Sequence, residues 1–216
     1  MVRPTGVSIT VGLPDHLRAE AAALYLEAFE AKLGPIIGRN QRAVDFLTAV
    51  MRPEAAIAAI ADDGRLVGLA GFHDGTGGFI GGGWRDLAAT FGRAGALWRA
   101  ALLSLFERAP EGDELLMDGI VVHRDARSMG MGTRLLDAVA ELGRERARSR
   151  VRLDVVDTNP RAQALYRNRG FMPIKTTHLR ILKPLFGFGA STTMALPLTG
   201  PGSSAAGQDH GPQNDV

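Results

Sequence analysis

The segment Leu115–Arg134 reads LLMDGIVVHRDARSMGMGTR, and its pattern decides the fold. An apolar run with Asp118 as its single charge predicts a buried strand over Leu115–Val122. A short loop follows, and then a sequence of helical periodicity, so a strand leads through a tight loop into a helix. In that loop, Gly130 and Gly132 permit positive φ and a close approach of the backbone to a ligand.

The start of this helix has the properties of an anion site. The first N–H groups of a helix lack acceptors within it, and the positive end of the helix dipole lies behind them. A Walker loop is not indicated, because Thr and Arg follow Gly132 where that loop needs Lys and Ser or Thr. The alternative is a purely structural turn without a ligand. The residues predicted to hold a pyrophosphate, including an arginine with forked donors, are Arg127, Ser128, Met129, Gly130, Met131, Gly132 and Thr133.

The composition is that of a globular protein and excludes several classes of function. The chain has 216 residues, of which 45% are hydrophobic and 22% charged, and this favours a single domain. The lack of cysteine excludes disulfide scaffolds, iron–sulfur clusters and cysteine nucleophiles, and the five histidines lack metal-ligand spacing, so we expect no metal. No long apolar run or secretory signal is present, so we expect a cytoplasmic protein without a membrane partner. A net charge of +2 argues against nucleic acid as a partner.

The basic residues are unevenly distributed. Of the 25 lysines and arginines, 11 lie between Arg124 and Arg169, around the predicted anion site. They are either solvated helix faces or a positive rim around a phosphorylated ligand. Only three of the 25 are lysines, namely Lys32, Lys175 and Lys183.

The first half of the chain contains a strong hairpin signal among helices. An Asp-Gly pair separates the apolar runs Ala56–Ala61 and Leu66–Phe72, which is typical of an antiparallel hairpin. Before it, helical periodicity predicts one helix that ends at Gly34-Pro35 and another from about Gln41 to Met51. After it, we expect a short edge strand at Phe79-Ile80 and a helical stretch over Trp84–Arg108 that breaks near Gly92–Gly95.

Strands and helices alternate in the second half, which predicts an α/β or α+β sheet with helices on both faces. Beyond Leu198 the chain has no apolar cluster to bury. We therefore expect residues 1–198 to form a single domain and residues 199–216 to form a disordered tail. The predicted later strands are Val151–Val156, Met172–Ile181 and Thr192–Leu198.

A second motif follows the predicted anion site. Asn159 and Tyr166 are seven residues apart and share one face of a helix that begins at Pro160. The two motifs together resemble the GNAT superfamily of acyl-CoA-dependent N-acetyltransferases. In that family, Arg/Gln-x-x-Gly-x-Gly/Ala follows the fourth strand, and a later motif contains Asn, Ala, Leu-Tyr and Gly-Phe. The matching residues here are Arg127, Gly130, Gly132, Asn159, Ala162, Leu165, Tyr166, Gly170 and Phe171.

The resemblance covers roughly Val7–Leu198, and the chain departs from a minimal member by a longer insertion at Gly75–Arg108 before the fourth strand. It implies a central mixed, mostly antiparallel sheet that is splayed between the fourth and fifth strands. It also implies acetyl-CoA as co-substrate, and no metal. The insertion is expected either to determine substrate specificity or to make a dimer contact.

The resemblance also implies roles for individual residues. The backbone of Ile120, Val121 and Val122 would bind the pantetheine arm, with the Val122 N–H facing the acetyl oxygen. Tyr166 matches the usual general acid near the sulfur, and Asn159 matches a residue that contacts the CoA arm. The alternatives are a buried tyrosine that only packs and a plain helix cap.

The sequence identifies the general base less clearly than it identifies the general acid. Asp118 lies four residues before Val122, where many polyamine-type members carry a catalytic glutamate. A carboxylate in an apolar strand should have a raised pKa, which suits a base, although backbone N–H groups could equally hold it as a structural group. His123 is expected to be an exposed loop residue. Glu27 and Glu30 either line the amine pocket or are solvated.

We therefore predict a cytoplasmic N-acetyltransferase that transfers an acetyl group from acetyl-CoA to a primary amine by direct attack in a ternary complex. A small-molecule amine is the expected acceptor, and a homodimer is an open option. The alternatives are a protein-amine acetyltransferase and a non-catalytic acyl-CoA-binding sensor or partner module.

Overall fold

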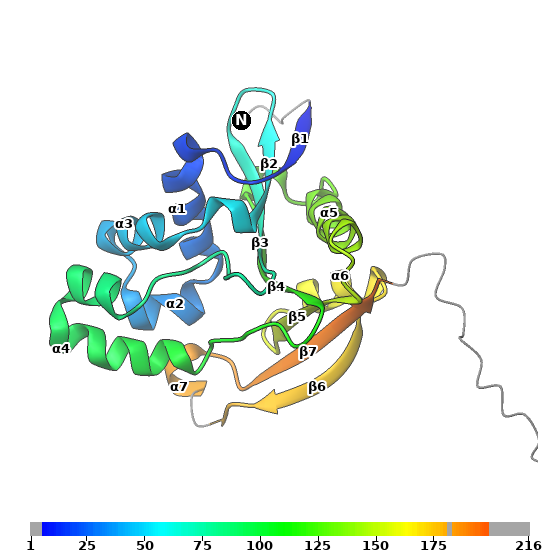
Figure 1. The fold of residues 1–216 in the computed structure, drawn as a ribbon. Helices are drawn as coiled ribbons and strands as arrows, with labels where there is room; N and C mark the ends of the chain where they lie inside the picture. Colours follow the sequence, from blue (N-terminus) through cyan, green and yellow to red (C-terminus); the bar gives the residue numbers. More distant parts are fainter. Residues whose placement is uncertain (1–5, 181–182, 199–216) are drawn as a thin grey trace, which may run out of the picture.

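The computed structural model describes residues 6–180 and 183–198, which form a seven-stranded mixed sheet (Figure 1). Neighbours β4 and β5 run parallel, and the other neighbouring pairs of described strands are antiparallel. This confirms the predicted mixed, mostly antiparallel sheet. The expected tail, residues 199–216, lies outside the described residues. In spatial order the strands are β1 (Val7–Val11), β2 (Ala56–Ala61), β3 (Leu66–His73), β4 (Glu114–Val122), β5 (Arg150–Val156), β7 (Ala190–Pro197) and β6 (Met172–His178).

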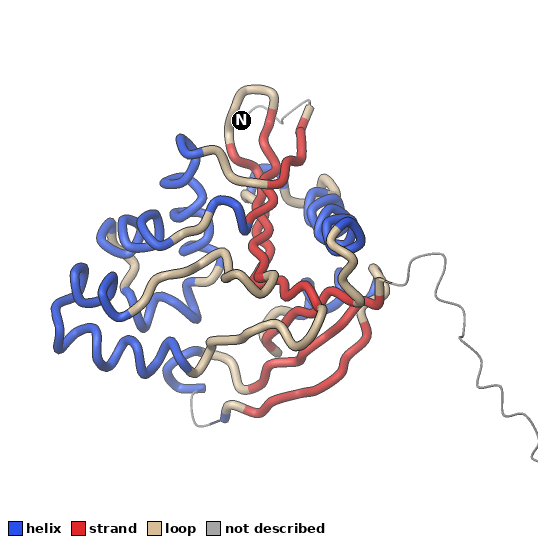
Figure 2. Tube along the Cα trace, in the orientation of Figure 1, coloured by secondary structure: helices blue, strands red, loops and turns tan. Residues whose placement is uncertain are grey.

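Helices cover both faces of the sheet, as predicted (Figure 2). Helices α1 to α4 lie on one face, which we call the α1–α4 face, and α5 and α6 lie on the other, the α5 face (Figure 1). The α5 helix buries Leu135, Leu136 and Val139, whose helical spacing gives it one apolar side. None of the described helices combines the length and apolar character needed to cross a membrane. The helices are α1 (Arg18–Ala28), α2 (Glu30–Ile37), α3 (Gln41–Val50), α4 (Trp84–Ser104), α5 (Met131–Glu145), α6 (Pro160–Asn168) and α7 (Lys183–Phe186).

Local sequence signals account for several elements. The predicted hairpin is formed by β2 and β3, with Gly64 in its turn at φ 85°. Asn40 caps α3 by accepting a hydrogen bond from the Ala43 N–H. The predicted break in α4 lies at Gly92, where φ is 72° and ψ is 163°.

Two local predictions are wrong. The first helix does not run to Gly34-Pro35, because the chain leaves helical geometry at Phe29 and α2 then continues through Pro35. Gly34 has no Cβ to clash with the proline ring, which removes the usual steric obstacle to helical geometry before a proline. The expected edge strand at Phe79-Ile80 is reduced to one bridge between Ile80 and Met51, and the Phe79 side chain is fully buried.

The sheet divides between β4 and β5. These strands pair only over Glu114–Met117 and Arg150–Leu153, and Met117 opposite Leu153 is the last pair. Beyond it, β4 continues to pair with β3 as far as Val122. This confirms the predicted splay between the fourth and fifth strands.

A β-bulge lies where the division begins. Gly71 pairs with Gly119 and Phe72 pairs with Met117, so Asp118 is the extra residue on β4. A bulge bends its strand and increases the local twist. The bend therefore explains why β4 leaves β5 immediately after Met117.

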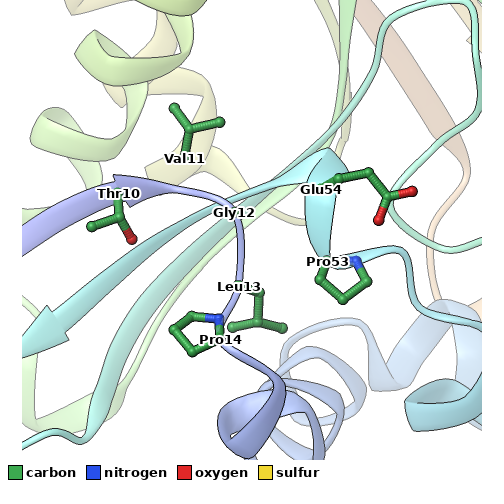
Figure 3. A pocket seen from close by; sticks show the side chains of 7 residues that line it. All are labelled: Thr10, Val11, Gly12, Leu13, Pro14, Pro53 and Glu54. Carbon is green, nitrogen blue, oxygen red and sulfur yellow. The ribbon is translucent and has the colours of Figure 1, made fainter.

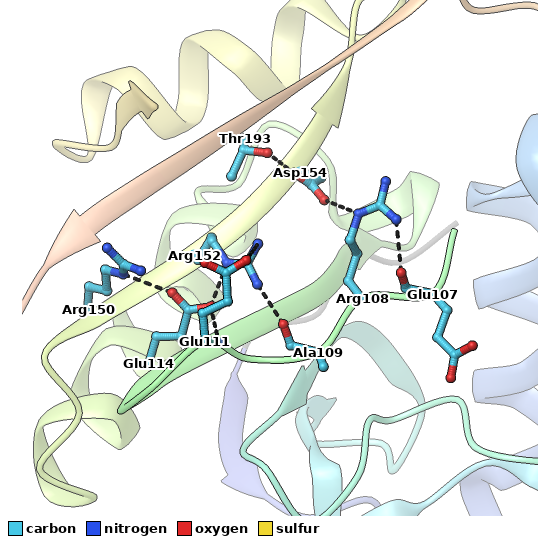
Figure 4. Close-up of polar contacts among 9 residues, drawn as sticks. All are labelled: Glu107, Arg108, Ala109, Glu111, Glu114, Arg150, Arg152, Asp154 and Thr193. Carbon is cyan, nitrogen blue, oxygen red and sulfur yellow. Dashed lines mark hydrogen bonds and ion pairs between the residues drawn. The ribbon is translucent and has the colours of Figure 1, made fainter. Parts of the chain in front are cut away.

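A buried ion cluster closes the other end of the β4–β5 pair (Figure 4). Glu114 is fully buried, and its carboxylate accepts hydrogen bonds from Arg152 Nε at 2.6 Å and Arg150 Nε at 2.8 Å. The same carboxylate accepts from the backbone N–H of Glu111 at 2.7 Å, and Arg152 donates to the Ala109 carbonyl at 2.7 Å. The cluster thus joins β5 to the start of β4 and to the loop before it.

Replacing Glu114 with Ala should destabilise the fold strongly. The substitution leaves Arg152 buried without its carboxylate, which costs about 3–5 kcal/mol. Urea unfolding followed by circular dichroism measures the change in the free energy of unfolding. The matched control is Glu141→Ala, which removes the exposed pair with Arg144 and should cost less than about 1 kcal/mol. Equal losses in the two variants would contradict a closing role for the cluster.

Candidate active site

The loop before α5 presents a row of free backbone donors. Gly130 has φ 74° and Ser128 has φ 66°, so two left-handed residues turn the chain sharply into the helix. The first N–H with a helical acceptor is that of Arg134, which donates to the Gly130 carbonyl. Among the described residues, none accepts a hydrogen bond from the six consecutive N–H groups of residues 128–133. Six free donors at a helix N-terminus are suited to an anion such as a pyrophosphate.

Two arginines flank this loop. Arg127 is exposed and donates from Nε to the Val122 carbonyl at 3.2 Å. Arg161, in the first turn of α6, donates to the Ser128 hydroxyl at 3.2 Å. The sequence analysis identified Arg127 and missed Arg161, whose only signal was its place in the basic region between Arg124 and Arg169.

The gap between the strands exposes a second set of backbone groups. The His123 N–H donates to the Val67 carbonyl on β3, and antiparallel bonding alternates along a strand. The N–H of Val121 therefore points toward β3, and those of Ile120 and Val122 point into the gap. Of the three residues expected to bind through their backbone, two present their N–H groups there, and the Val121 side chain is buried.

The two sequence motifs meet at Gly132. A Cβ added to Gly132 would lie 3.3 Å from Leu165 of α6 and 3.9 Å from Val122 of β4. The first turn of α5, the open part of β4 and the middle of α6 are therefore in contact. Tyr166 is the next residue of α6 after this contact.

Tyr166 is buried and packs against Phe171, with 5.8 Å between the ring centroids. Burial raises the pKa of its hydroxyl, which stays protonated at neutral pH. No other described residue forms a hydrogen bond with this hydroxyl. The geometry thus combines the packing expected of a core tyrosine with a proton that is available to a ligand.

Asn159 is a helix cap. Its Oδ1 accepts a hydrogen bond from the Ala162 N–H at 3.1 Å, at the start of α6. The side chain is exposed, and its amide nitrogen has no acceptor among the described residues. The cap therefore holds α6 in place and leaves two amide donors facing outward.

Asp118 lies on the α1–α4 face of the bulge, where Oδ2 accepts a hydrogen bond from the Phe79 N–H at 2.8 Å. Burial raises the pKa of Asp118, and this N–H, His73 and Lys32 partly oppose the rise. The other carboxylate oxygen has no hydrogen-bond donor among the described residues. Asp118 therefore has a structural partner and one oxygen that is free to accept a proton.

Aromatic side chains surround the bulge on the same face. Phe29 lies directly against Gly119, at a position where any Cβ on Gly119 would overlap its ring. Tyr25 packs on Phe29 and Phe79, with ring centroids 4.4 and 5.5 Å apart. Burial and then the charge of Asp118 raise the pKa of the Tyr25 hydroxyl. The wall around Asp118 is thus largely apolar, which explains the desolvation of its carboxylate.

A cavity of about 480 Å³ lies on the α1–α4 face over the C-terminal half of the sheet. The side chain of Val151 on β5 lies near Gly143 of α5, so its alternating neighbours on β5 point to the opposite face, into the cavity. Asp154 pairs there with Arg108 at 3.6 Å and accepts from the Thr193 hydroxyl at 2.5 Å (Figure 4). The lining residues are Arg108, Glu111, Arg150, Arg152, Asp154, Ile174, Lys175, Thr177, Ser191 and Thr193.

A second hollow, of about 400 Å³, lies at the end of β1 (Figure 3). It is lined by Thr10–Pro14 with Pro53 and Glu54. Because β2 and β3 separate β1 from β4 in the sheet, this hollow is remote from the gap.

Three further residues that the sequence analysis considered near the active site are His123, Glu27 and Glu30. His123 is half-buried rather than exposed, and its Nδ1 accepts from the Asp125 N–H at 3.3 Å. Glu27 and Glu30 are exposed, and Glu30 pairs with Arg39, so Glu30 is a solvated, paired residue.

Comparisons with known proteins identify the family and the fold. Residues 21–171 match the model of the Acetyltransferase (GNAT) family. No curated protein sequence matches the chain. A GCN5-related N-acetyltransferase from Kribbella flavida is similar in structure, with a TM-score of 0.61 and 16% identity over 89% of this chain and 98% of that one.

Two further solved structures are similar. One is yncA from Salmonella typhimurium with its cofactor acetyl-CoA, with a TM-score of 0.59 and 15% identity over 92% of this chain and 96% of that one. The other is the ribosomal-protein-S18-alanine N-acetyltransferase from Escherichia coli, with a TM-score of 0.53 and 16% identity over 93% of this chain and 99% of that one. At these identities the likenesses show the shared fold.

Gly130→Val should abolish the binding of CoA. Valine is strongly disfavoured at positive φ, so the loop would rearrange and scatter the row of N–H groups. Thermal unfolding with and without CoA measures the effect, since a ligand at about 100 times its dissociation constant stabilises the native state by about 2.7 kcal/mol.

Gly64→Val is the matched control. Gly64 also has positive φ, at 85°, and open space around its Cα, but it lies in the β2–β3 turn. This variant should lose stability while keeping its thermal shift with CoA. Normal CoA binding by Gly130→Val would show that the loop is not the anion site.

Proposed function

Since the chain belongs to the GNAT acetyltransferase family and is an acyltransferase, we propose that it transfers the acetyl group of acetyl-CoA to the primary amine of a small molecule. The transfer occurs by direct attack within a ternary complex. The observation that carries the proposal is the row of six free N–H groups beside the open part of β4. The cytoplasmic location and the homodimer stay predictions of the sequence.

The residues present fit acetyl-CoA in their donor chemistry. The free N–H groups of residues 128–133 would hold the pyrophosphate, with Arg127 and Arg161 as flanking cations. The N–H groups of Ile120 and Val122 face the gap, where the amide groups of the pantetheine arm need partners. Acetyl-CoA supplies an activated thioester, and the chain's own groups position it and move protons.

Tyr166 is the proposed donor to the leaving sulfur. Its pKa is raised by burial, so the phenol is a weaker acid than an alkyl thiol, whose pKa is about 8.5 for cysteine. The hydroxyl therefore acts by donating a hydrogen bond to the thiolate as the carbon–sulfur bond breaks. The backbone N–H of Ile120 or Val122 would stabilise the oxygen of the tetrahedral intermediate.

Asp118 is the proposed general base. An ammonium group has no lone pair, so the acceptor must lose a proton before it attacks. The free oxygen of Asp118 accepts that proton, directly or through a water, and its raised pKa brings it closer to a useful range than an ordinary aspartate.

A small-molecule acceptor is supported by the cavity beside Asp154. Its volume of about 480 Å³ lies in the range of small-molecule sites, about 300–1,000 Å³. Asp154 is the first residue of β5 beyond the last β4–β5 pair, so the cavity adjoins the gap. A non-catalytic sensor would have no need of a buried phenol whose hydroxyl has no hydrogen-bond partner among the described residues.

Tyr166→Phe should lower turnover about 100-fold, within the usual contribution of a proton donor, and leave the affinity for acetyl-CoA nearly unchanged. Release of free thiol with a panel of primary amines measures turnover, and calorimetry measures the affinity. The hydroxyl has no partner among the described residues, so the variant should unfold at nearly the same temperature. Unchanged turnover would remove the donor role, and absence of thiol release from the wild type with every amine would favour the sensor.

Asp118→Asn should lower kcat/KM by about 10²–10⁴ and remove the acidic limb of its pH profile. In the wild type, kcat/KM falls as the pH drops through the pKa of Asp118, and this pKa lies above the ordinary value of about 3.9. Asparagine keeps an oxygen that can accept the Phe79 N–H, so the fold should persist. An acidic limb that survives in the variant would assign the base to another group.

A further inference from the structure

Lys32 occupies an unusual place for a lysine. It lies on α2 one turn after Phe29, the residue that covers Gly119 at the bulge. The side chain is half-buried, and its Nζ lies 5.0 Å from the centroid of the Phe106 ring. Burial lowers the pKa of Lys32, which increases the fraction of uncharged, nucleophilic amine.

Two carboxylates stand near this amine, one from each side of the division in the sheet. Asp118 and Asp154 are the residues directly after the last pair of β4 and β5, Met117 opposite Leu153. Their charges favour the charged form of Lys32 and so raise its pKa, whereas Arg108 opposes them. Because Phe29 contacts Gly119, the residue after Asp118, and Lys32 follows one turn later on α2, the helix places Lys32 on the α1–α4 face near the bulge.

The choice of lysine at this position is informative. Of the 25 basic residues of the chain, 22 are arginines, so a lysine is the exception wherever a positive charge occurs. The other two lysines, Lys175 and Lys183, are exposed. A guanidinium stays protonated in proteins, whereas an ammonium can lose its proton and attack a carbonyl carbon.

We propose that Lys32 is itself an acceptor, and that the enzyme acetylates this lysine from its own bound acetyl-CoA. The inference rests on the proposed function, because it uses the same thioester site. The Nζ lone pair forms a bond to the thioester carbonyl carbon, and the carbon–sulfur bond breaks. The sulfur leaves with the electron pair as CoA thiolate, and the ammonium proton passes to Asp118 or to water.

The modification would change the site. Acetylation turns the Lys32 cation into a neutral amide, so Asp118 and Asp154 lose a positive charge that acts on them. It also places an N-acetyl group where an external amine has to enter. Self-acetylation at Lys32 therefore competes with transfer to a free acceptor.

The test is incubation of the full-length protein with acetyl-CoA in the absence of any amine acceptor, followed by digestion and mass spectrometry of all three lysines. We expect Lys32 to gain one acetyl group at a rate independent of protein concentration. It should react at least about 100-fold faster than exposed Lys175 and Lys183, since an amine held beside a bound thioester reacts as an intramolecular pair. Excess CoA should suppress the reaction.

Controls separate enzymatic from simple chemical acetylation. Acetyl phosphate lacks the CoA moiety, so it should not be directed to Lys32. A preference of this reagent for Lys32 as large as that of acetyl-CoA would overturn the proposal. Lys32→Arg keeps a cation near Phe106 and should abolish the modification, whereas Lys183→Arg, a matched control at an exposed lysine that does not line the cavity, should leave it intact. An unmodified Lys32 in a protein that releases thiol with added amines would overturn this proposal and leave the proposed function standing. Absence of both CoA binding and thiol release would overturn the two together.

Discussion

The extra residue in β4 is the constraint on which the site depends. Because Asp118 has no partner in the β3–β4 ladder, the strand bends there and its pairing with β5 ends at Met117. The buried Glu114 cluster holds the same two strands together four residues earlier. The β4–β5 pair is thus held together at the Glu114 end and separated beyond Met117. The backbone groups of β4 that face the gap beyond Met117 have no partner on β5 and are available to a ligand.

The gap between β4 and β5 can be approached from both faces of the sheet. On the α5 face, the free N–H groups of residues 128–133 lie beside the open part of β4, and Leu165 of α6 packs against the same turn. On the α1–α4 face, Asp118 lies at the bulge and Asp154 lines a cavity. In the proposed reaction, a thioester bound from one face meets an amine from the other, and neither reactant crosses the closed part of the sheet.

The sequence predicts the parts of this arrangement that local patterns encode. The strand–loop–helix of Leu115–Arg134, the hairpin at Gly64 and the start of α6 all follow from turn and cap residues close in sequence. Residues that act through distant contacts were not predictable in this way. The ion pairs of Glu114 and the contact of Phe29 with Gly119 join segments that are far apart in the chain, so no periodicity marks them. Pro35 misled the sequence analysis because its glycine neighbour removes the usual steric conflict.

The insertion before β4 has a structural role at the site itself. Its start is tied to the body of the protein: the carbonyl of Asp74, the residue before the insertion, accepts from Arg148, and the carbonyl of Thr76 accepts from Arg52, each at 3.0 Å. Phe79 then packs against Gly71, in a space that a larger residue at that position would fill. This fixes the Phe79 N–H that donates to Asp118. Because a bulged residue receives no orientation from the ladder, the insertion, rather than the sheet, determines where the proposed base points.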